Sequence, residues 1–265
     1  MLRGGGDLAS GVALRLQRAG LRVVITELAQ PLVVRRLVSF AEAVYNGQTR
    51  VEEVLARRVE TPVQALPVLD QGEIAVLVDP PADSRHYFQP LVLIDGRMAK
   101  RPSELDRQAA PLVIGLGPGF MAGQDCHAVV ETQRGHLLGR VIWLGASQPD
   151  TGIPETVGER GQERVLRAPA DGPLVAQAEI GDRLETGQVV AEVGGKMVKA
   201  PFDGVLRGLV HPGLVVWRGQ KIGDVDPRNN PEYCRLVSDK ALAVGGGVLE
   251  AILTYPELRR RLWER

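Results

Sequence analysis

The chain has 265 residues, a length that suits one large domain or two of modest size. Hydrophobic residues make up 44% and charged residues 24%, which is typical of a globular protein with a buried core. Lys plus Arg number 32 and so do Asp plus Glu, so no overall basic charge favours nucleic acid or a membrane surface as a partner.

The cysteines and the apolar stretches bear on the cellular compartment. Cys126 and Cys234 are far apart and outside any metal-ligand spacing, which predicts neither a disulfide framework nor a metal site. No secretory signal pattern opens the sequence, and the longest uncharged apolar stretch, residues 109–123, is shorter than the ~20 residues of a membrane span. We therefore expect a cytoplasmic protein that does not cross a membrane.

The first glycine cluster, residues 4–11, opens a helix-type apolar pattern that Gly20 ends, and a strand is expected over residues 21–26. The pattern Gly-x-Gly-x-x-Ala, with an acid after the next strand, is typical of loops that hold a dinucleotide pyrophosphate at a helix N-terminus. The alternative is close packing of strand and helix without a ligand. The predicted binding residues are Gly4, Gly5, Gly6, Asp7, Ser10, Gly11 and Glu27.

The strand before this cluster is only Met1–Arg3, whereas strands usually have ~5–6 residues, so we expect the natural chain to begin earlier. A helix is then predicted around residues 39–45, a turn at Asn46-Gly47 and a strand over 51–54.

Three buried strands are predicted farther along, at residues 74–78, 91–94 and 111–114. The first two end on aspartates and the third runs into a second glycine loop. Such strand ends meet at one edge of a parallel sheet, where α/β proteins bind ligands. The predicted binding residues of this loop are Gly115, Gly117, Gly119 and Phe120.

Ionisable residues are dense after the second loop. The candidates for catalysis are Asp125, His127, Glu131 and Arg134. The alternative is a polar surface strand, and the pattern does not decide which residue does chemistry. Cys126 is either a sulfur or selenium acceptor or a buried structural cysteine, and the second is favoured because nothing in the sequence lowers its pKa.

An internal repeat begins at Val165. Shifting residues 165–193 by 32 positions superposes them on residues 197–225 with nine identities, most at turn-type Pro, Asp or Gly. Two interlocked copies resemble the flattened barrel of biotinyl and lipoyl domains. The hairpin that would carry a modified lysine is too short around Lys196, so no biotin or lipoate is expected, and the repeat is interpreted as a docking or cofactor-gripping module.

The elements together predict an α/β protein. Residues 1–160 are expected to form a Rossmann-like parallel sheet of nucleotide-binding type. Residues 161–228 are expected to form an inserted, duplicated all-β barrel (a barrel-sandwich hybrid) without a carrier lysine. Residues 229–265 are predicted to be a helical tail that returns to the first domain.

Seven blocks, in order along nearly the whole chain, resemble the YqeB-type accessory proteins of selenium-dependent molybdenum hydroxylase systems. The blocks are Arg3–Gly11, Arg35–Tyr45, Ile114–Phe120, Glu131–His136, Thr151–Pro154, Asp224–Arg228 and Ser238–Ala241. Cys126 departs from the family pattern, which has an aliphatic residue there, and this argues against an essential thiol.

The resemblance implies a maturation factor that binds a molybdopterin dinucleotide-type cofactor or nucleotide. The implied partner is a molybdenum hydroxylase or another cofactor-maturation protein. Two alternatives stay open: an NAD-dependent oxidoreductase acting on a small substrate, and a selenium or sulfur transferase that uses Cys126. Whether the protein is an enzyme, and whether it forms a homo-oligomer, stays open at this point.

Overall fold

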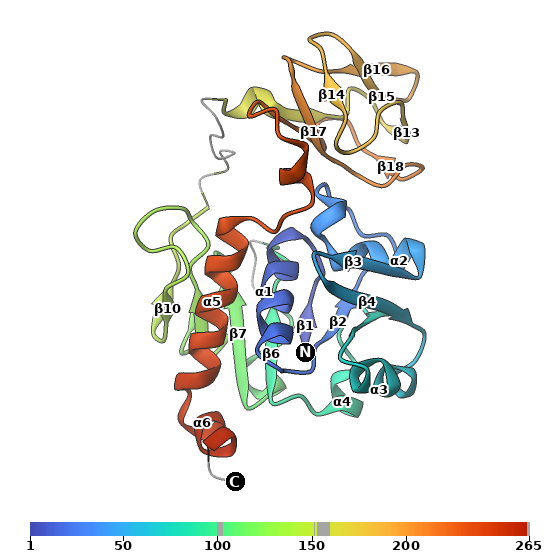
Figure 1. The fold of residues 1–265 in the computed structure, drawn as a ribbon. Coiled ribbons are helices and arrows are strands. Elements are labelled where there is room, and N and C mark those ends of the chain that lie inside the picture. The colour runs from blue at the N-terminus through green and yellow to red at the C-terminus, as the bar shows by residue number, and fades with distance from the viewer. Residues whose placement is uncertain (100–102, 151, 153–159, 264–265) are drawn as a thin grey trace. The chain divides into compact units, whose positions relative to one another are not determined.

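The computed structural model describes residues 1–99, 103–150, 152 and 160–263, and it contains two compact units (Figure 1). The first unit joins residues 1–31, 40–150 and 237–265, and the second joins residues 32–39 with 151–236. The block 151–154 lies outside the described residues except for Gly152. No helix in the described ranges is both long and apolar enough to cross a membrane.

A nine-stranded sheet forms the centre of the first unit, with the order β10-β9-β7-β6-β1-β2-β5-β4-β3. Its seven inner strands pair in parallel, and β10 and β3 are antiparallel at the two edges. The strands are β1 (Leu2–Arg3), β2 (Val24–Glu27), β3 (Gln48–Val51), β4 (Val54–Val59), β5 (Ile74–Val78), β6 (Val92–Asp95), β7 (Leu112–Leu116), β9 (Ala128–Val130) and β10 (Val141–Ile142).

The chain enters this sheet in the middle. β1 pairs with β2 on one side and with β6 on the other. From β2 the chain continues to the β3–β4 hairpin at one edge, returns to β5 between β4 and β2, and then crosses β1 to reach β6 and β7. The strand order therefore reverses between β1 and β6, which is the position where open α/β sheets bind ligands at the carboxyl ends of the strands. The loops after β1, β6, β7 and β9 all leave the sheet at that edge.

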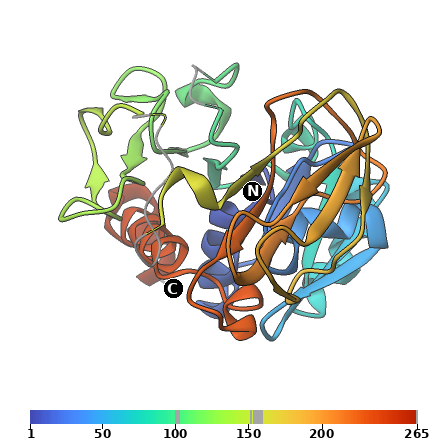
Figure 2. The same ribbon diagram turned by 90° about the horizontal axis from the view of Figure 1, so that it is seen from above.

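Helix α1 (Asp7–Arg18) packs against α5 (Asp239–Thr254), and the two lie side by side in Figures 1 and 2. Glycines allow this approach, because a Cβ on Gly11 would lie 2.5 Å from the Cβ of Ala241. A Cβ on Gly245 would lie 2.8 Å from the Cγ of Arg15. The contacts advance in the same direction along both helices, so α1 and α5 are parallel and begin at the same edge of the sheet.

The remaining helices of the first unit are α2 (Ala43–Asn46), α3 (Pro62–Asp70), α4 (Arg85–Phe88) and α6 (Pro256–Trp263). Helix α3 begins where the sequence dictates, because Thr61 and Gln64 form a reciprocal capping box and Pro62 occupies the first helical position. It covers β4 and β5 through a cluster that includes Ala65 and Leu69. A small sheet pairs β8 (Met121–Ala122) with β11 (Gly145–Ala146).

The three buried strands expected from the sequence are confirmed as β5, β6 and β7, and the helix expected at residues 39–45 is a 3-10 turn followed by α2. The strand expected at residues 51–54 is wrong. Val51 ends β3 and Val54 begins β4, and the two residues between them form the turn of this hairpin, in which Glu52 has the left-handed φ of 52°. Val51 and Val54 are buried on either side of the turn, which produced the apolar signal.

The second unit contains two four-stranded sheets, ordered β12-β19-β17-β14 and β16-β15-β13-β18. The strands are β12 (Val165–Arg167), β13 (Gly172–Ala176), β14 (Arg183–Leu184), β15 (Val189–Val193), β16 (Lys196–Lys199), β17 (Gly204–Leu209), β18 (Val215–Val216) and β19 (Lys221–Asp226). A shift of 32 residues carries the first four strands onto the last four. Each sheet takes two strands from each copy, so the copies are interlocked.

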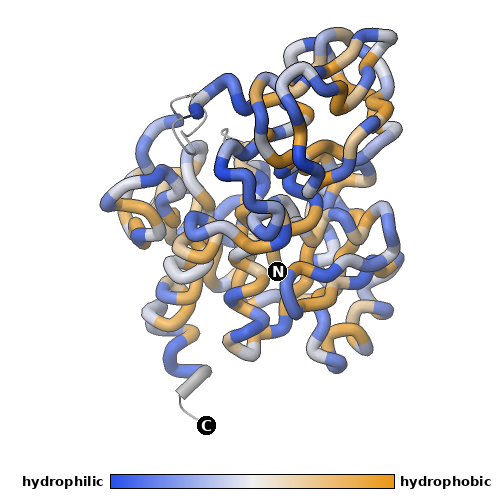
Figure 3. The backbone as a smooth tube through the Cα atoms, turned by 45° about the horizontal axis from the view of Figure 1, so that its top comes forward, coloured by the Kyte–Doolittle hydropathy of each residue, from blue (hydrophilic) through white to orange (hydrophobic). Residues whose placement is uncertain are grey.

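The overall class is therefore mixed α/β, with one large mixed sheet and several antiparallel sheets. The sheets of the second unit remain two separate sheets, and no closed barrel is found in the part of the chain that the structure describes. Figure 3 shows hydrophobic stretches in the strands and helices and hydrophilic stretches in many of the connecting loops.

Candidate functional site

The first glycine loop connects β1 to α1 at the reversal point of the sheet. The Gly4 amide donates to the Thr26 carbonyl at 2.8 Å, and the Gly5 amide donates to Oε2 of Glu27 at 2.7 Å. Gly4 has φ +88°, which favours glycine, and a Cβ on Gly5 would lie 2.8 Å from the Ala41 nitrogen. Glycine is therefore required at both positions by the fold itself.

Glu27 lies at the end of β2, where the dinucleotide-binding pattern places its acidic residue. Its Oε1 accepts from the Leu28 amide at 2.7 Å, so each carboxylate oxygen already has a backbone partner. The residue is 9% exposed, and burial raises the pKa of its carboxyl group. Glu27 thus holds the glycine loop in place through the Gly5 amide, and its role in ligand binding stays a prediction.

Two other residues of the predicted set have structural contacts. The Ser10 hydroxyl donates to the Gly5 carbonyl at 2.9 Å and accepts from the Phe40 amide at 2.8 Å. Gly11 lies beneath Ala241 at the crossing of α1 and α5. Both residues are buried, so these contacts account for them within the fold.

The amide groups left for an anion belong to Gly6 and the first turn of α1. Gly6 is the N-cap of α1 in an extended conformation, with φ −69° and ψ 178°. No acceptor for its amide is found among the described residues, whereas its carbonyl accepts from the Ser10 amide. The first amides of a helix have no partner within the helix and form a partial positive charge, so this end of α1 favours an anion. Asp7 is half-buried in the same turn.

Two arginines and two acids form a charged cluster beside the loop. Arg3, 2% exposed, bonds to Asp95 Oδ2 at 3.1 Å and to Glu104 Oε2 at 3.3 Å. Arg97 shares both acids, with Nη2 at 2.7 Å from Asp95 Oδ2 and 3.0 Å from Glu104 Oε2. The pKa of Glu104 is lowered to about 2, first by its own backbone amide and then by Arg97.

Arg97 lies directly against the glycine loop. A Cβ on Gly4 would come within 3.2 Å of the Arg97 Cα and 3.3 Å of its Cγ. The arginine side chain is 25% exposed and its partner Glu104 is 61% exposed. The backbone and the Cγ of Arg97 therefore pack against Gly4, while its guanidinium is bonded to Asp95 and Glu104.

The second glycine loop, after β7, is shaped mainly by packing. A Cβ on Gly115 would lie 2.3 Å from the Phe120 ring, so Gly115 provides the space in which that buried ring packs. Gly117 has φ +68°, and a Cβ there would lie 2.3 Å from the Thr132 Oγ1. Gly119 has φ +105° and is half-buried. The loop thus touches the segment that follows β9.

Glu131 organises that segment. It is 1% exposed and accepts three backbone hydrogen bonds of 2.7 Å, from the amides of Thr132, Gln133 and Gln148. Arg134 forms a bidentate pair with Asp239 at the start of α5, with distances of 2.6 and 2.7 Å. The segment after β9 is therefore tied to the N-terminus of α5 at the same edge as the first glycine loop.

Asp125 and His127 lie at the opposite end of β9 from Glu131 and Arg134. Asp125 Oδ2 accepts from the Met121 amide, and His127 Nδ1 accepts from the Val113 amide, both at 2.9 Å. Burial lowers the pKa of His127. The polar surface strand considered as an alternative is wrong, because β9 is buried along its whole length. The four candidates for catalysis are therefore not brought together.

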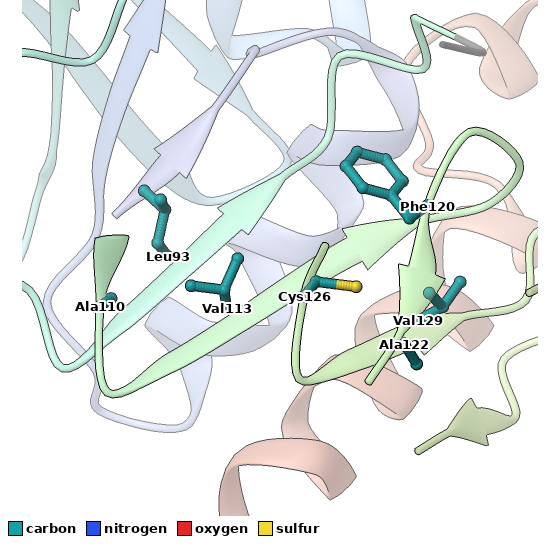
Figure 4. Close-up of a cluster of buried hydrophobic side chains, with 7 residues drawn as sticks. All are labelled: Leu93, Ala110, Val113, Phe120, Ala122, Cys126 and Val129. Atoms are coloured by element: carbon teal, nitrogen blue, oxygen red, sulfur yellow. The ribbon is translucent and has the colours of Figure 1, made fainter. Parts of the chain in front are cut away.

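Cys126 belongs to a hydrophobic cluster with Leu93, Val113, Phe120 and Val129 (Figure 4). The residue is 1% exposed, and burial raises the pKa of its thiol to about 11. A thiol with so high a pKa is protonated at neutral pH, which is the reverse of what a nucleophilic cysteine needs.

Sequence reasoning missed the cluster of Arg3, Arg97 and Glu104. Asp95 was noted only as a strand end, and Arg3 gave no signal because Asp95 and Glu104, the acids that it shares with Arg97, lie 92 and 101 residues farther along the chain. Within the described ranges, no group of three or more His, Cys, Asp and Glu side chains is arranged to hold a metal ion.

No family model matches the chain. Among solved structures, the chain is similar to the apo ectoine utilization protein EutE (DoeB) from Ruegeria pomeroyi, with 18% identity, 32% of this chain and 28% of that chain covered and a TM-score of 0.23. It is also similar to an aspartoacylase family protein from Mesorhizobium loti, with 13% identity, 31% and 32% covered and a TM-score of 0.22. Likenesses this low carry no argument about fold or function.

A curated relative gives a much stronger match. The chain is 46% identical over 253 residues to the "Uncharacterized protein YqeB" of Escherichia coli (strain K12). The match covers 96% of this chain and 47% of the relative, so the chain spans about half the length of that protein. On this identity, the chain belongs to the YqeB-type family.

Proposed function

We propose that the chain is an accessory or maturation factor for selenium-dependent molybdenum hydroxylases. In this role it binds a molybdopterin dinucleotide-type cofactor, or a related nucleotide, and hands it to a partner enzyme. The observation that carries the proposal is the placement of the first glycine loop at the carboxyl edge, where the strand order reverses between β1 and β6.

The chemistry of that edge fits a phosphorylated ligand. Gly6 and the first turn of α1 offer amide donors, and Arg97, which packs against Gly4, carries a guanidinium on a side chain that is 25% exposed. The proposal includes the finer fold assignment: a Rossmann-like module, with the interlocked strands of the second unit forming a barrel-sandwich hybrid that grips the cofactor or docks the partner. Membership of the YqeB-type family supports the maturation role, because that role is what the resemblance implies.

An NAD-dependent oxidoreductase is the second candidate, favoured by the position of Glu27 at the end of β2. The contacts of Glu27 weaken it, because both carboxylate oxygens already accept backbone amides and the residue is buried. The hypothesis of a selenium or sulfur transferase is weakened because the thiol of Cys126 is buried and its pKa is raised.

A thermal-shift screen separates these functions. The purified protein is heated with NAD, NADP, CTP, GTP, AMP and molybdopterin dinucleotides in turn. A ligand at 100 times its dissociation constant stabilises the folded state by about 2.7 kcal/mol, which is readily measured. Stabilisation by a molybdopterin dinucleotide or its nucleotide supports the cofactor role. Stabilisation by NAD alone would replace it with the oxidoreductase, and no shift with any ligand would refute nucleotide binding.

A further inference from the structure

An open groove of about 860 Å³ lies in the first unit, and no residue of the two glycine loops lines it. Three chain segments line it. The first runs from α4 to the start of β6, the second is the segment that precedes β7, and the third is α6, which contributes Arg261. Pro90 and Leu91 come before the first residue of β6, and Pro111 comes before the first residue of β7. The groove therefore reaches the amino ends of these parallel strands, whereas the glycine loops follow carboxyl ends.

The size and the walls of the groove suit a small organic molecule. Ligand sites in proteins commonly measure about 300–1,000 Å³ and combine apolar walls with a few polar groups. Here the apolar walls are Pro90, Leu91, Leu105, Ala109 and Pro111. Such walls can pack against a ring, and they offer nothing to a bare inorganic ion.

The acidic side chains in the groove already have partners. Glu104 faces the guanidinium groups of Arg3 and Arg97 through its Oε2. Asp106 caps a 3-10 turn by accepting the Gln108 amide at 2.8 Å. The cation of Arg85 is also engaged, with the Ala82 carbonyl at 3.0 Å and Asp83 at 3.1 Å.

Four polar side chains in the lining have no partner among the described residues: Arg261, His86, Gln89 and Gln108. Arg261 is a permanent cation with five N–H donors, and the two carboxamides each add two donors. The groups left available for a ligand are therefore mainly donors, with positive charge from Arg261. They match a ligand that is anionic and rich in acceptors.

We propose that this groove binds an organic anion of nucleotide size, with its charged group on Arg261 and His86 and its ring against the apolar wall. The site is distinct from the glycine loop and does not depend on the function proposed for that loop. Glu104 lines the groove and also bonds to Arg97, so the two regions share one residue.

The test uses AMP as the probe and the full chain as the protein, in the Gly6→Pro background. Proline fits the φ of −69° at this position and removes the Gly6 amide donor, so AMP binding at the glycine loop is weakened while the residues that line the groove are unchanged. Calorimetry then compares this protein with one that also carries His86→Gln and Arg261→Gln. The matched control is Arg259→Gln, an exposed residue of the same helix that does not line the groove.

The expected result is that AMP binds and that the double change weakens it about tenfold or more, the loss expected for charge-assisted hydrogen bonds. Arg259→Gln should leave the affinity within about twofold, and inorganic phosphate should bind more weakly than AMP because it has no ring. Photolabelling of the wild-type chain with 8-azido-AMP gives a second measurement, with label expected in residues 85–91 or 104–111. Absence of AMP binding, insensitivity to the double change, phosphate binding as tight as AMP, or label confined to residues 4–9 would each overturn the proposal.

Discussion

The contact between α1 and α5 can be tested with two glycine-to-alanine changes. At Gly11, the added Cβ would lie 2.5 Å from the Cβ of Ala241 and 2.9 Å from its backbone carbon and oxygen. The obstacle includes backbone, so a side-chain rotation cannot relieve the clash and α5 must shift. At Gly246, in the interior of α5, the same methyl group meets nothing within 4 Å.

Both changes replace glycine by alanine in a helix interior. The higher helix propensity of alanine stabilises the folded state by about 1 kcal/mol at each site. This gain cancels when the two variants are compared, so their difference isolates the clash. Overpacking of this kind costs typically about 1–3 kcal/mol. Gly246→Ala should therefore raise the free energy of unfolding by about 1 kcal/mol, and Gly11→Ala should unfold more easily than Gly246→Ala by about 1–3 kcal/mol.

Urea denaturation of both variants measures this difference, with the slope m checked for equality so that the midpoints report stability alone. Equal stability of Gly11→Ala and Gly246→Ala would refute the close packing of α5 on α1 at Gly11.

Three further predictions concern buried ionisable groups. Glu131→Gln should lower the free energy of unfolding by about 1–3 kcal/mol, because a carboxamide cannot accept at both ends and leaves a buried amide unpaired. Urea melts should show no such loss for the exposed control Glu250→Gln, and a stable Glu131→Gln would argue against the three amide contacts. Cys126 should resist iodoacetamide at pH 8 in the native protein and react once urea exposes it, with the label located by peptide mass spectrometry. Rapid labelling of the native protein would instead support the transferase function. Burial raises the folded pKa of Glu27 above its unfolded value, so its protonated form stabilises the folded state at low pH and this contribution is lost as the pH rises through the folded pKa. The unfolding free energy of wild type relative to Glu27→Gln, followed by urea melts across that range, should therefore fall with rising pH, and a rise would contradict the assignment.

The sequence predicted the elements whose signals are local. The apolar runs at β5, β6 and β7 are continuous because these inner strands are buried on both faces. The repeat at 32 residues anticipated which strands of the second unit correspond, since the turn residues recur at the same positions. The β3–β4 hairpin was missed, because Glu52 adopts a left-handed φ without a glycine to signal the turn.

The site was predicted less completely, because distant residues build it. Gly4, Gly5 and Gly6 were found from their spacing, but the same spacing could not show that Gly5 donates to Glu27 or that Gly11 serves helix packing. His127 and Glu131 are close in sequence, yet they flank a three-residue parallel strand and so lie at opposite edges of the sheet. Arg97 could not be recognised as a site residue from the sequence, because its position beside the first glycine loop depends on the pairing of β6 with β1.

The central claim, an anion held by the Gly6 amide at the start of α1, is tested most directly by comparing Gly6→Pro with Gly6→Ala. Both residues fit the extended backbone at this position, but only alanine keeps the N–H. The measurement is the thermal stabilisation of each variant by a molybdopterin dinucleotide at 100 times the wild-type dissociation constant. We predict that Gly6→Ala keeps a stabilisation of about 2.7 kcal/mol and that Gly6→Pro loses most of it. Equal stabilisation of the two variants would contradict the assignment of this loop as the cofactor site. The absence of stabilisation in the wild type and in both variants would contradict it as well.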